Sequence, residues 1–184
     1  GMVGALEAAG IPAFGPKANA AIIEASKAFS KELMKKYNIP TAQYETFTEL
    51  DKALAYIREQ GAPIVVKADG LALGKGVVVA ATVEEAETAV REMMEDKKFG
   101  ASGSTVVIEE CMVGPEVTVL AFCDGEHLVP MLSSQDHKRA YDGNKGPNTG
   151  GMGTYSPSLV FDEELKERIR TEILEPTLAG FQAG

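Results

Sequence analysis

Apolar residues recur at helical spacing in five segments of the chain. The spacing predicts helices over residues 2–10, 26–37, 48–61, 82–93 and 162–173. In the second of these, Phe29, Leu33 and Tyr37 form the apolar side, and we expect Lys31 with the neighbouring lysines on the opposite, polar side. Helix ends are marked by capping signals at Thr48 with Asp51, Gly61, Thr82 with Glu85, and Asp162.

Short apolar runs between these helices predict strands over residues 11–14, 63–67, 77–81 and 104–110. From residue 48 to 110 the order is therefore helix, strand, strand, helix, strand, which describes a small α+β subdomain with a largely antiparallel sheet. Further apolar segments at 116–122 and 127–132 belong to a second body, and His127 is expected inside a strand with a structural role. Residues 133–157 are polar and glycine-rich, and a structureless loop of that length is usually functional.

The composition argues against several classes of protein. Of the 184 residues, 45% are apolar, and 18 Lys and Arg against 27 Asp and Glu give a net charge of −9. That charge argues against a nucleic-acid or anionic-membrane partner, and no apolar run is long enough for a membrane helix. The spacing of the two cysteines is not that of a metal site, and so few cysteines indicate reduced thiols. We therefore expect a cytoplasmic protein.

The segment 67–76 connects two predicted strands and has a composition suited to phosphate. Lys67 and Lys75 supply charge, while Gly70, Gly74 and Gly76 allow close backbone approach. The spacing differs from that of a Walker A loop, because Gly76 stands where Ser or Thr is needed. A flexible hairpin with solvated lysines is the alternative that composition leaves open.

A second candidate lies where the last predicted strand ends. Glu109, Glu110, Cys111 and Met112 lead from one body to the next, where backbone groups could face a planar ring and Glu116 a ribose. Solvated strand-end carboxylates are the alternative here. A third candidate combines the run 135–139, which holds an acid and three basic residues, with the glycine-rich run 146–153. This combination suits an anion, or is a charged surface beside a flexible loop.

Five of these motifs occur together and in one order: Ser26-Lys27-Ala28-Phe29, the segments 67–76, 107–110 and 135–139, and 146–153 with Tyr155-Ser156-Pro157. In this they resemble the phosphoribosylamine–glycine ligase family, also called glycinamide ribonucleotide synthetase. The resemblance implies an α+β ATP-grasp fold with a small α+β lid subdomain and an incomplete α/β core. It implies the divisions 1–15 (tail of a preceding domain), 16–44 (linker helix), 45–113 (lid) and 114–184 (first part of the core).

For such a family the resemblance implies ATP-dependent joining of glycine to 5-phosphoribosylamine through a glycyl phosphate, with Mg²⁺, or alternatively Mn²⁺, in purine biosynthesis. The implied ATP-binding residues are Lys27, Lys67, Gly70, Gly74, Lys75, Gly76, Glu109, Glu110, Cys111, Met112 and Glu116. The implied substrate-binding residues are Asp136, Lys138, Asn148, Thr149, Gly150 and Gly151.

By the same resemblance the metal ligands lie beyond Gly184, so neither a metal ligand nor a catalytic residue is expected in this chain. We therefore expect a central fragment that is inactive alone. The full-length protein is expected to be a monomer, whereas the fragment could self-associate through an open sheet edge. Two alternatives remain: an isolated non-catalytic ATP-binding module, and another ATP-grasp carboxylate–amine ligase.

Overall fold

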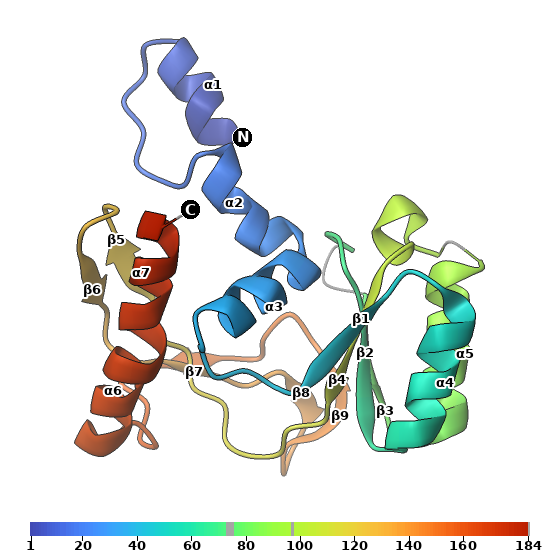
Figure 1. Ribbon diagram of the computed structural model, residues 1–184. Helices are drawn as coiled ribbons and strands as arrows, with labels where there is room; N and C mark the ends of the chain where they lie inside the picture. Colours follow the sequence, from blue (N-terminus) through green and yellow to red (C-terminus); the bar gives the residue numbers. More distant parts are fainter. Residues whose placement is uncertain (73–75, 97, 184) are drawn as a thin grey trace. The chain divides into compact units, whose positions relative to one another are not determined.

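The computed structural model describes residues 1–72, 76–96 and 98–183 (Figure 1). The chain forms two compact units. Unit 1 comprises Gly1–Lys36 and Thr41–Met112, and unit 2 comprises Tyr37–Pro40 and Val113–Gly184.

Unit 1 is built on a four-stranded antiparallel sheet. Its strands, in spatial order, are β1 (Tyr44–Phe47), β4 (Val106–Glu110), β2 (Ile64–Ala68) and β3 (Val77–Ala80). Two helices, α4 (Leu50–Gln60) and α5 (Val83–Met94), cover one face of this sheet (Figure 1). The predicted α+β order and antiparallel sheet are confirmed, although β1 was not anticipated because its four residues carry no clear apolar run.

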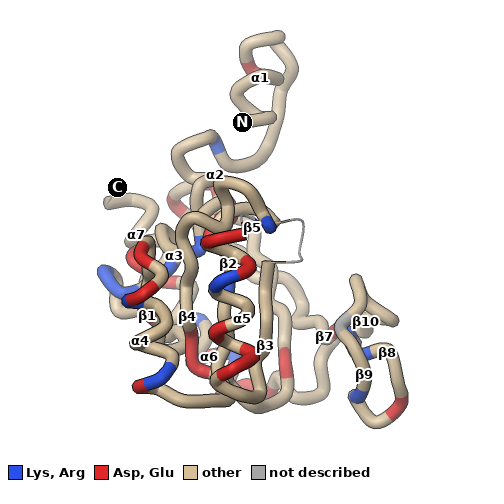
Figure 2. Tube along the Cα trace, turned by 90° about the vertical axis from the view of Figure 1, so that its right-hand side faces the viewer, with Lys and Arg blue, Asp and Glu red and all other residues tan. Residues whose placement is uncertain are grey.

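The core of unit 1 lies between the sheet and these two helices. Its largest fully buried side chains include Ile57, Val66, Val90, Met93 and Ile108. Alternate residues of β2 and β4 enter this core, because successive side chains of a strand point to opposite faces. The outer surface of α5 is acidic, with four glutamates against one arginine, as the charges in Figure 2 indicate.

Two of the three helix-capping signals predicted in unit 1 are confirmed. The Thr82 hydroxyl accepts a hydrogen bond from the N–H of Glu85 (3.2 Å) at the start of α5, as predicted. The predicted cap at Thr48 is wrong, because α4 begins after Glu49 and no side chain caps it. Gly61 ends α4 with a φ of +78°, a conformation that favours glycine.

The first part of unit 1 is helical. It contains α1 (Met2–Ala8), α2 (Ala18–Ala25) and α3 (Lys27–Lys36), followed much later by the short 3₁₀ helix Gly100–Gly103. The strand predicted at residues 11–14 is wrong, since this exposed segment pairs with no neighbouring strand among the described residues. Helix α2 was not predicted, because its apolar residues form no one-sided stripe.

Unit 2 consists of three small antiparallel strand pairs and a C-terminal helical region. The pairs are β5 (Ala121–Cys123) with β6 (Leu128–Pro130), β7 (Gln135–Asp136) with β10 (Thr154–Tyr155), and β8 (Arg139–Tyr141) with β9 (Lys145–Asn148). The helical region is α6 (Glu163–Ile169), a π-helical turn (Arg170–Leu174) and α7 (Glu175–Ala183). Asp162 caps α6 as predicted, with its carboxylate accepting from the N–H of Leu165 at 2.8 Å.

Two expectations for unit 2 are corrected. Residues 133–157 are not structureless, because their backbone forms the β7–β10 and β8–β9 pairs. His127 precedes β6 rather than lying in it. The Asp124 carboxylate accepts hydrogen bonds from the N–H groups of Glu126 and His127 and so fixes a turn there. None of the described helices is both long and apolar enough to cross a membrane.

Candidate functional site

The principal candidate site lies on the open face of the unit 1 sheet. Val66 and Ile108 face the core, so their neighbours Lys67 and Glu109 face the other way. There, Lys67 Nζ donates a hydrogen bond to Glu109 Oε2 at 2.8 Å. The Glu109 side chain is only 6% exposed, which rules out the solvated strand-end carboxylate that composition left open for this residue.

Lys31 of α3 completes an ion triad with these two residues. Its Nζ lies 3.4 Å from Glu109 Oε1, and also donates to Thr41 Oγ1 (2.6 Å) and to the Ala42 carbonyl (3.4 Å). The prediction that Lys31 lies on the polar, solvent-facing side of its helix is therefore wrong. The buried carboxylate draws this one lysine inward, because a buried charge needs a partner.

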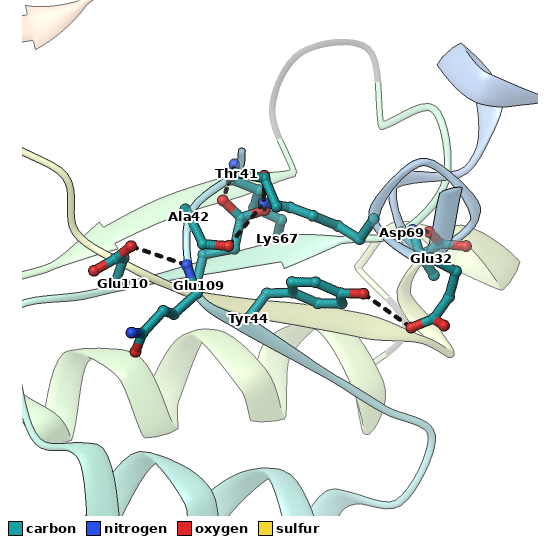
Figure 3. A network of polar contacts seen from close by, with 11 residues as sticks. Glu32, Thr41, Ala42, Tyr44, Lys67, Asp69, Glu109 and Glu110 are labelled. Carbon is teal, nitrogen blue, oxygen red and sulfur yellow. Dashed lines mark hydrogen bonds and ion pairs between the residues drawn. The ribbon is translucent and has the colours of Figure 1, made fainter. Parts of the chain in front are cut away.

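Tyr44 supports the triad from the neighbouring strand. It lies opposite Glu109 in the β1–β4 register, and the centre of its ring is 5.2 Å from Lys31 Nζ. Its hydroxyl donates to Glu32 Oε1 at 2.9 Å (Figure 3). Burial and, after it, the hydrogen bond to the Glu32 carboxylate raise the pKa of Tyr44 to about 12, so the phenol stays a neutral donor.

The start of α3 is tied to the beginning of the 67–76 segment. The Asp69 carboxylate accepts from the Ala28 N–H at 2.6 Å and from the Ser26 hydroxyl at 3.1 Å. Lys27 Nζ in turn donates to the carbonyls of Asp69 (3.3 Å) and Gly70 (3.2 Å). Lys27 and Lys67, which are far apart in the sequence, therefore both belong to the open side of unit 1.

The glycines of this segment serve packing. A Cβ on Gly70 would lie 2.4 Å from Ser102 Oγ, and one on Gly76 would lie 2.5 Å from Ala72 Cβ. The N–H of Gly70 donates to the Ser102 carbonyl at 3.3 Å, so it is already used within the protein. Gly74 and Lys75 lie outside the described residues.

The end of β4 pairs with the chain before β1. Glu110 N–H donates to the Gln43 carbonyl at 3.0 Å, and Glu110 Oε1 accepts from the Gln43 N–H at 2.9 Å (Figure 3). Beyond it, Cys111 is a half-buried free thiol and Met112 is 71% exposed. An exposed apolar side chain just beyond a strand end suits contact with a planar ring.

A second cluster forms within unit 2. Lys138 Nζ lies 3.2 Å from Glu116 Oε1 and 3.8 Å from Asp136 Oδ2. The Thr149 N–H and hydroxyl both donate to the Lys138 carbonyl, at 2.7 and 2.9 Å. The structure therefore brings Glu116, predicted to contact ribose, together with residues predicted to contact the second substrate.

The glycine-rich run 148–153 lies beside the charged run in this cluster. His137 N–H donates to the Gly153 carbonyl (2.9 Å), and the backbone of Asn148 pairs with β8. Gly151 has a φ of +125° and its N–H donates to Thr149 Oγ1 at 3.1 Å, whereas a Cβ on Gly150 would meet open space.

The two clusters differ in the ligands they can hold. In unit 1 two lysines share one buried carboxylate, which leaves a net positive charge suited to an anionic phosphate chain. The described residues contain no group of three or more His, Cys, Asp or Glu side chains placed to hold a metal ion.

Sequence reasoning missed Lys31, Thr41, Tyr44 and Asp69. A signal existed for Lys31, because it follows Lys27 by one helical turn and must share its face. No local pattern indicates the other three, whose partners are at least ten residues away.

Comparison with known proteins is consistent with this geometry. Residues 25–184 match the family described as phosphoribosylglycinamide synthetase, ATP-grasp (A) domain. Phosphoribosylamine–glycine ligases from Vibrio cholerae and Xanthomonas campestris are 53% and 55% identical over 183 residues, which is the whole of this chain but 43% and 42% of those proteins. The chain thus spans less than half the length of the curated relatives it matches.

Solved structures give the same result. The crystal structure of phosphoribosylamine–glycine ligase from Thermotoga maritima has a TM-score of 0.82 at 35% identity, covering 91% of this chain and 42% of that one. D-alanine–D-alanine ligase from Bacillus anthracis complexed with ATP has a TM-score of 0.62 at 26% identity, covering 98% and 54%. On these matches the chain has an ATP-grasp fold and belongs to the phosphoribosylglycinamide synthetase ATP-grasp domain family.

Proposed function

We propose that this chain is the nucleotide-binding part of an enzyme that joins glycine to 5-phosphoribosylamine at the expense of ATP. The products are glycinamide ribonucleotide, ADP and phosphate, and the intermediate is a glycyl phosphate, as in purine biosynthesis. The relatives named as phosphoribosylamine–glycine ligases support this reaction. The observation that carries the ATP-binding step is the net positive ion triad of Lys31, Glu109 and Lys67.

In this proposal unit 1 binds ATP. Lys27 and Lys67 donate to the phosphates. Backbone groups of Glu109–Met112 read the edge of adenine. The support for these roles is the charge of the triad and the exposed strand end at Met112.

We assign the phosphoribosylamine to the cluster in unit 2. There Asp136 and Lys138 offer opposite charges, and the run 148–151 offers backbone donors beside the exposed Gly150. ATP-grasp chemistry uses a divalent cation, here Mg²⁺ or Mn²⁺, which would offset the charge of the phosphates. We place the reaction in the cytoplasm, since both cysteines are free thiols.

Calorimetric titration with magnesium–ATP tests the nucleotide site. We expect the 184-residue chain to bind, and Lys67→Ala to lose most of the affinity, because the cation nearest the open face is removed. Lys35→Ala, an exposed lysine on α3, is the matched control and should bind like the unchanged chain. Equal binding by Lys67→Ala, or no binding by the folded unchanged chain, would contradict the proposal.

An ATP-binding module without catalysis is the second candidate. Formation of ADP that depends on both glycine and phosphoribosylamine would exclude it for this chain. Protection of residues 136–153 from proteolysis by phosphoribosylamine, but not by another amine, would separate this substrate from those of other ATP-grasp carboxylate–amine ligases.

A further inference from the structure

Lys31 differs from the other lysines of the nucleotide site in how its ammonium group is used. Only 9% of its side chain is exposed. Its Nζ donates hydrogen bonds to Thr41 Oγ1 and the Ala42 carbonyl, and it forms an ion pair with Glu109 Oε1 at 3.4 Å. The ammonium group is therefore directed at protein oxygens and not at solvent. Among the described residues, Lys27 Nζ instead donates to backbone carbonyls at the start of a glycine-rich segment, which a phosphate could replace.

The charge count of the triad depends on this buried lysine. Lys31 and Lys67 together carry two positive charges against one negative charge on Glu109. Without Lys31, Glu109 and Lys67 would form a neutral pair with little attraction for an anion. Glu109 Oε1 would also lose its ion-pair partner in a site where the side chain is 6% exposed.

The two lysines of the triad differ in their surroundings. Glu109 turns one oxygen to each lysine, Oε1 to Lys31 and Oε2 to Lys67. The Tyr44 ring faces Lys31 Nζ from β1, so the ammonium is enclosed by protein on that side. Lys67 is the more exposed of the two lysines, with 27% of its side chain accessible. A ligand that approaches the sheet face therefore meets Lys67 and not Lys31.

We propose that Lys31 is a positioning residue of the nucleotide site: it neutralises Glu109 and fixes its carboxylate, so that Lys67 keeps its positive charge for the phosphates. This inference rests on the proposed ATP-binding function of unit 1. It predicts that removing the charge of Lys31 weakens binding most for the ligands with the greatest negative charge, although Lys31 itself does not contact the ligand.

The test compares three ligands on variants of the full 184-residue chain. Lys31→Met keeps the length of the side chain and removes its charge. We expect its Kd for magnesium–ATP to rise about tenfold or more, that for ADP to rise less, and that for adenosine to change by less than about twofold. Lys35→Met, on the exposed side of the same helix, is the control and should leave all three unchanged.

The double variant Lys31→Met/Glu109→Gln restores the net charge of the cluster to one, so it should recover ATP affinity relative to Lys31→Met. Should Lys31→Met fail to fold, Lys31→Gln replaces it, because it also removes the charge but keeps a polar group near Thr41 and the Ala42 carbonyl. The order of losses for magnesium–ATP, ADP and adenosine should be the same. Between Glu109→Gln and the double variant the ATP Kd should change little, because Lys31 then has no carboxylate to neutralise.

Three results would overturn the inference. The first is an ATP Kd of folded Lys31→Met within about twofold of the unchanged chain. The second is an equal loss for adenosine, which would show a merely structural role. The third is ATP binding by the double variant that is no tighter than that of Lys31→Met. If the unchanged chain binds no ATP, the proposed function fails as well, whereas in the other cases it stands.

Discussion

Unit 1 and unit 2 are stabilised in different ways. In the described chain, the buried apolar side chains belong to unit 1 except for Ile39, and most of them form one cluster between a sheet and two helices. Unit 2 instead buries the polar residues Ser133 and Ser158, and it exposes Leu132 (75%) and Leu159 (90%). Unit 1 thus has a core of its own, whereas unit 2 relies on backbone pairing and side-chain hydrogen bonds.

This difference bears on the two candidate sites. In the triad of unit 1, Glu109 and Lys67 lie on the two central strands of a packed sheet and Lys31 lies on α3, and these elements hold the side chains in fixed places. The cluster of unit 2 stands on strands of two to four residues and on hydrogen-bonded loops. We therefore expect the nucleotide site to be largely preformed and the second site to be more easily disturbed.

Removal of a core side chain should separate the two units most clearly. Ile57→Ala in unit 1 should lower the free energy of unfolding by about 2 to 5 kcal/mol, because it leaves a cavity at a fully buried position. Leu132→Ala in unit 2, at an exposed position, should change it by less than about 0.5 kcal/mol. Urea unfolding followed by circular dichroism measures both, and similar losses would refute the contrast.

Removal of a buried hydroxyl should lower the local stability of unit 2. Ser133 Oγ accepts from the Ser158 N–H at 3.2 Å, so Ser133→Ala leaves a buried donor without that partner. The local cost should be about 1 to 3 kcal/mol, read from faster hydrogen exchange of the Ser158 amide. Ser104→Ala, an exposed serine of unit 1, is the control. An unchanged exchange rate at Ser158 would show that polar bonds do not hold unit 2 together.

Removal of the two confirmed N-terminal helix caps should give smaller losses of stability, and the two losses can be compared directly. Thr82→Ala and Asp162→Ala should each cost about 1 kcal/mol at their helices. In α5, which has buried residues, the cost should appear in unfolding of unit 1. In α6, which has none, it should appear only as local fraying. Residue-by-residue hydrogen exchange distinguishes these results, and a global effect of Asp162→Ala would contradict our comparison.

The smallest effect concerns pH and the exposed turn of unit 2. Hydrogen bonds from the N–H groups of Glu126 and His127, and then from the His127 ring, lower the pKa of Asp124 to about 2. Because this pKa lies below the ordinary 3.8, the turn is stabilised above pH about 4 and loses that support as pH falls through about 2. NMR titration of the Asp124 carboxyl carbon should find this midpoint. A midpoint near the ordinary value would show that these hydrogen bonds do not stabilise the turn. Asp124→Asn removes the titrating group and should abolish the transition.

Sequence patterns predicted the parts of the fold that depend on neighbouring residues. The helices around Ile57 and Val90, the antiparallel strands beside them and the Thr82 cap all follow from spacing within one segment. The strand expected at 11–14 failed because a strand exists only with a partner, and the pattern cannot show whether one is present. The prediction of a structureless loop at residues 133–157 was wrong in the opposite sense. Backbone pairing forms strands in this segment, although its side chains show no apolar period.

By itself the sequence determined the α+β class, the motifs that place the chain in its family, and the involvement of Lys27, Lys67 and Glu109 in a candidate site. Only the tertiary structure decided that Glu109 is buried and that Lys31, rather than facing solvent, turns inward to meet it. The physical reason is that burial and charge pairing are properties of three-dimensional neighbours. Lys31 and Glu109 are separated by most of unit 1 in sequence, and the packing of α3 against β4 brings them within 3.4 Å.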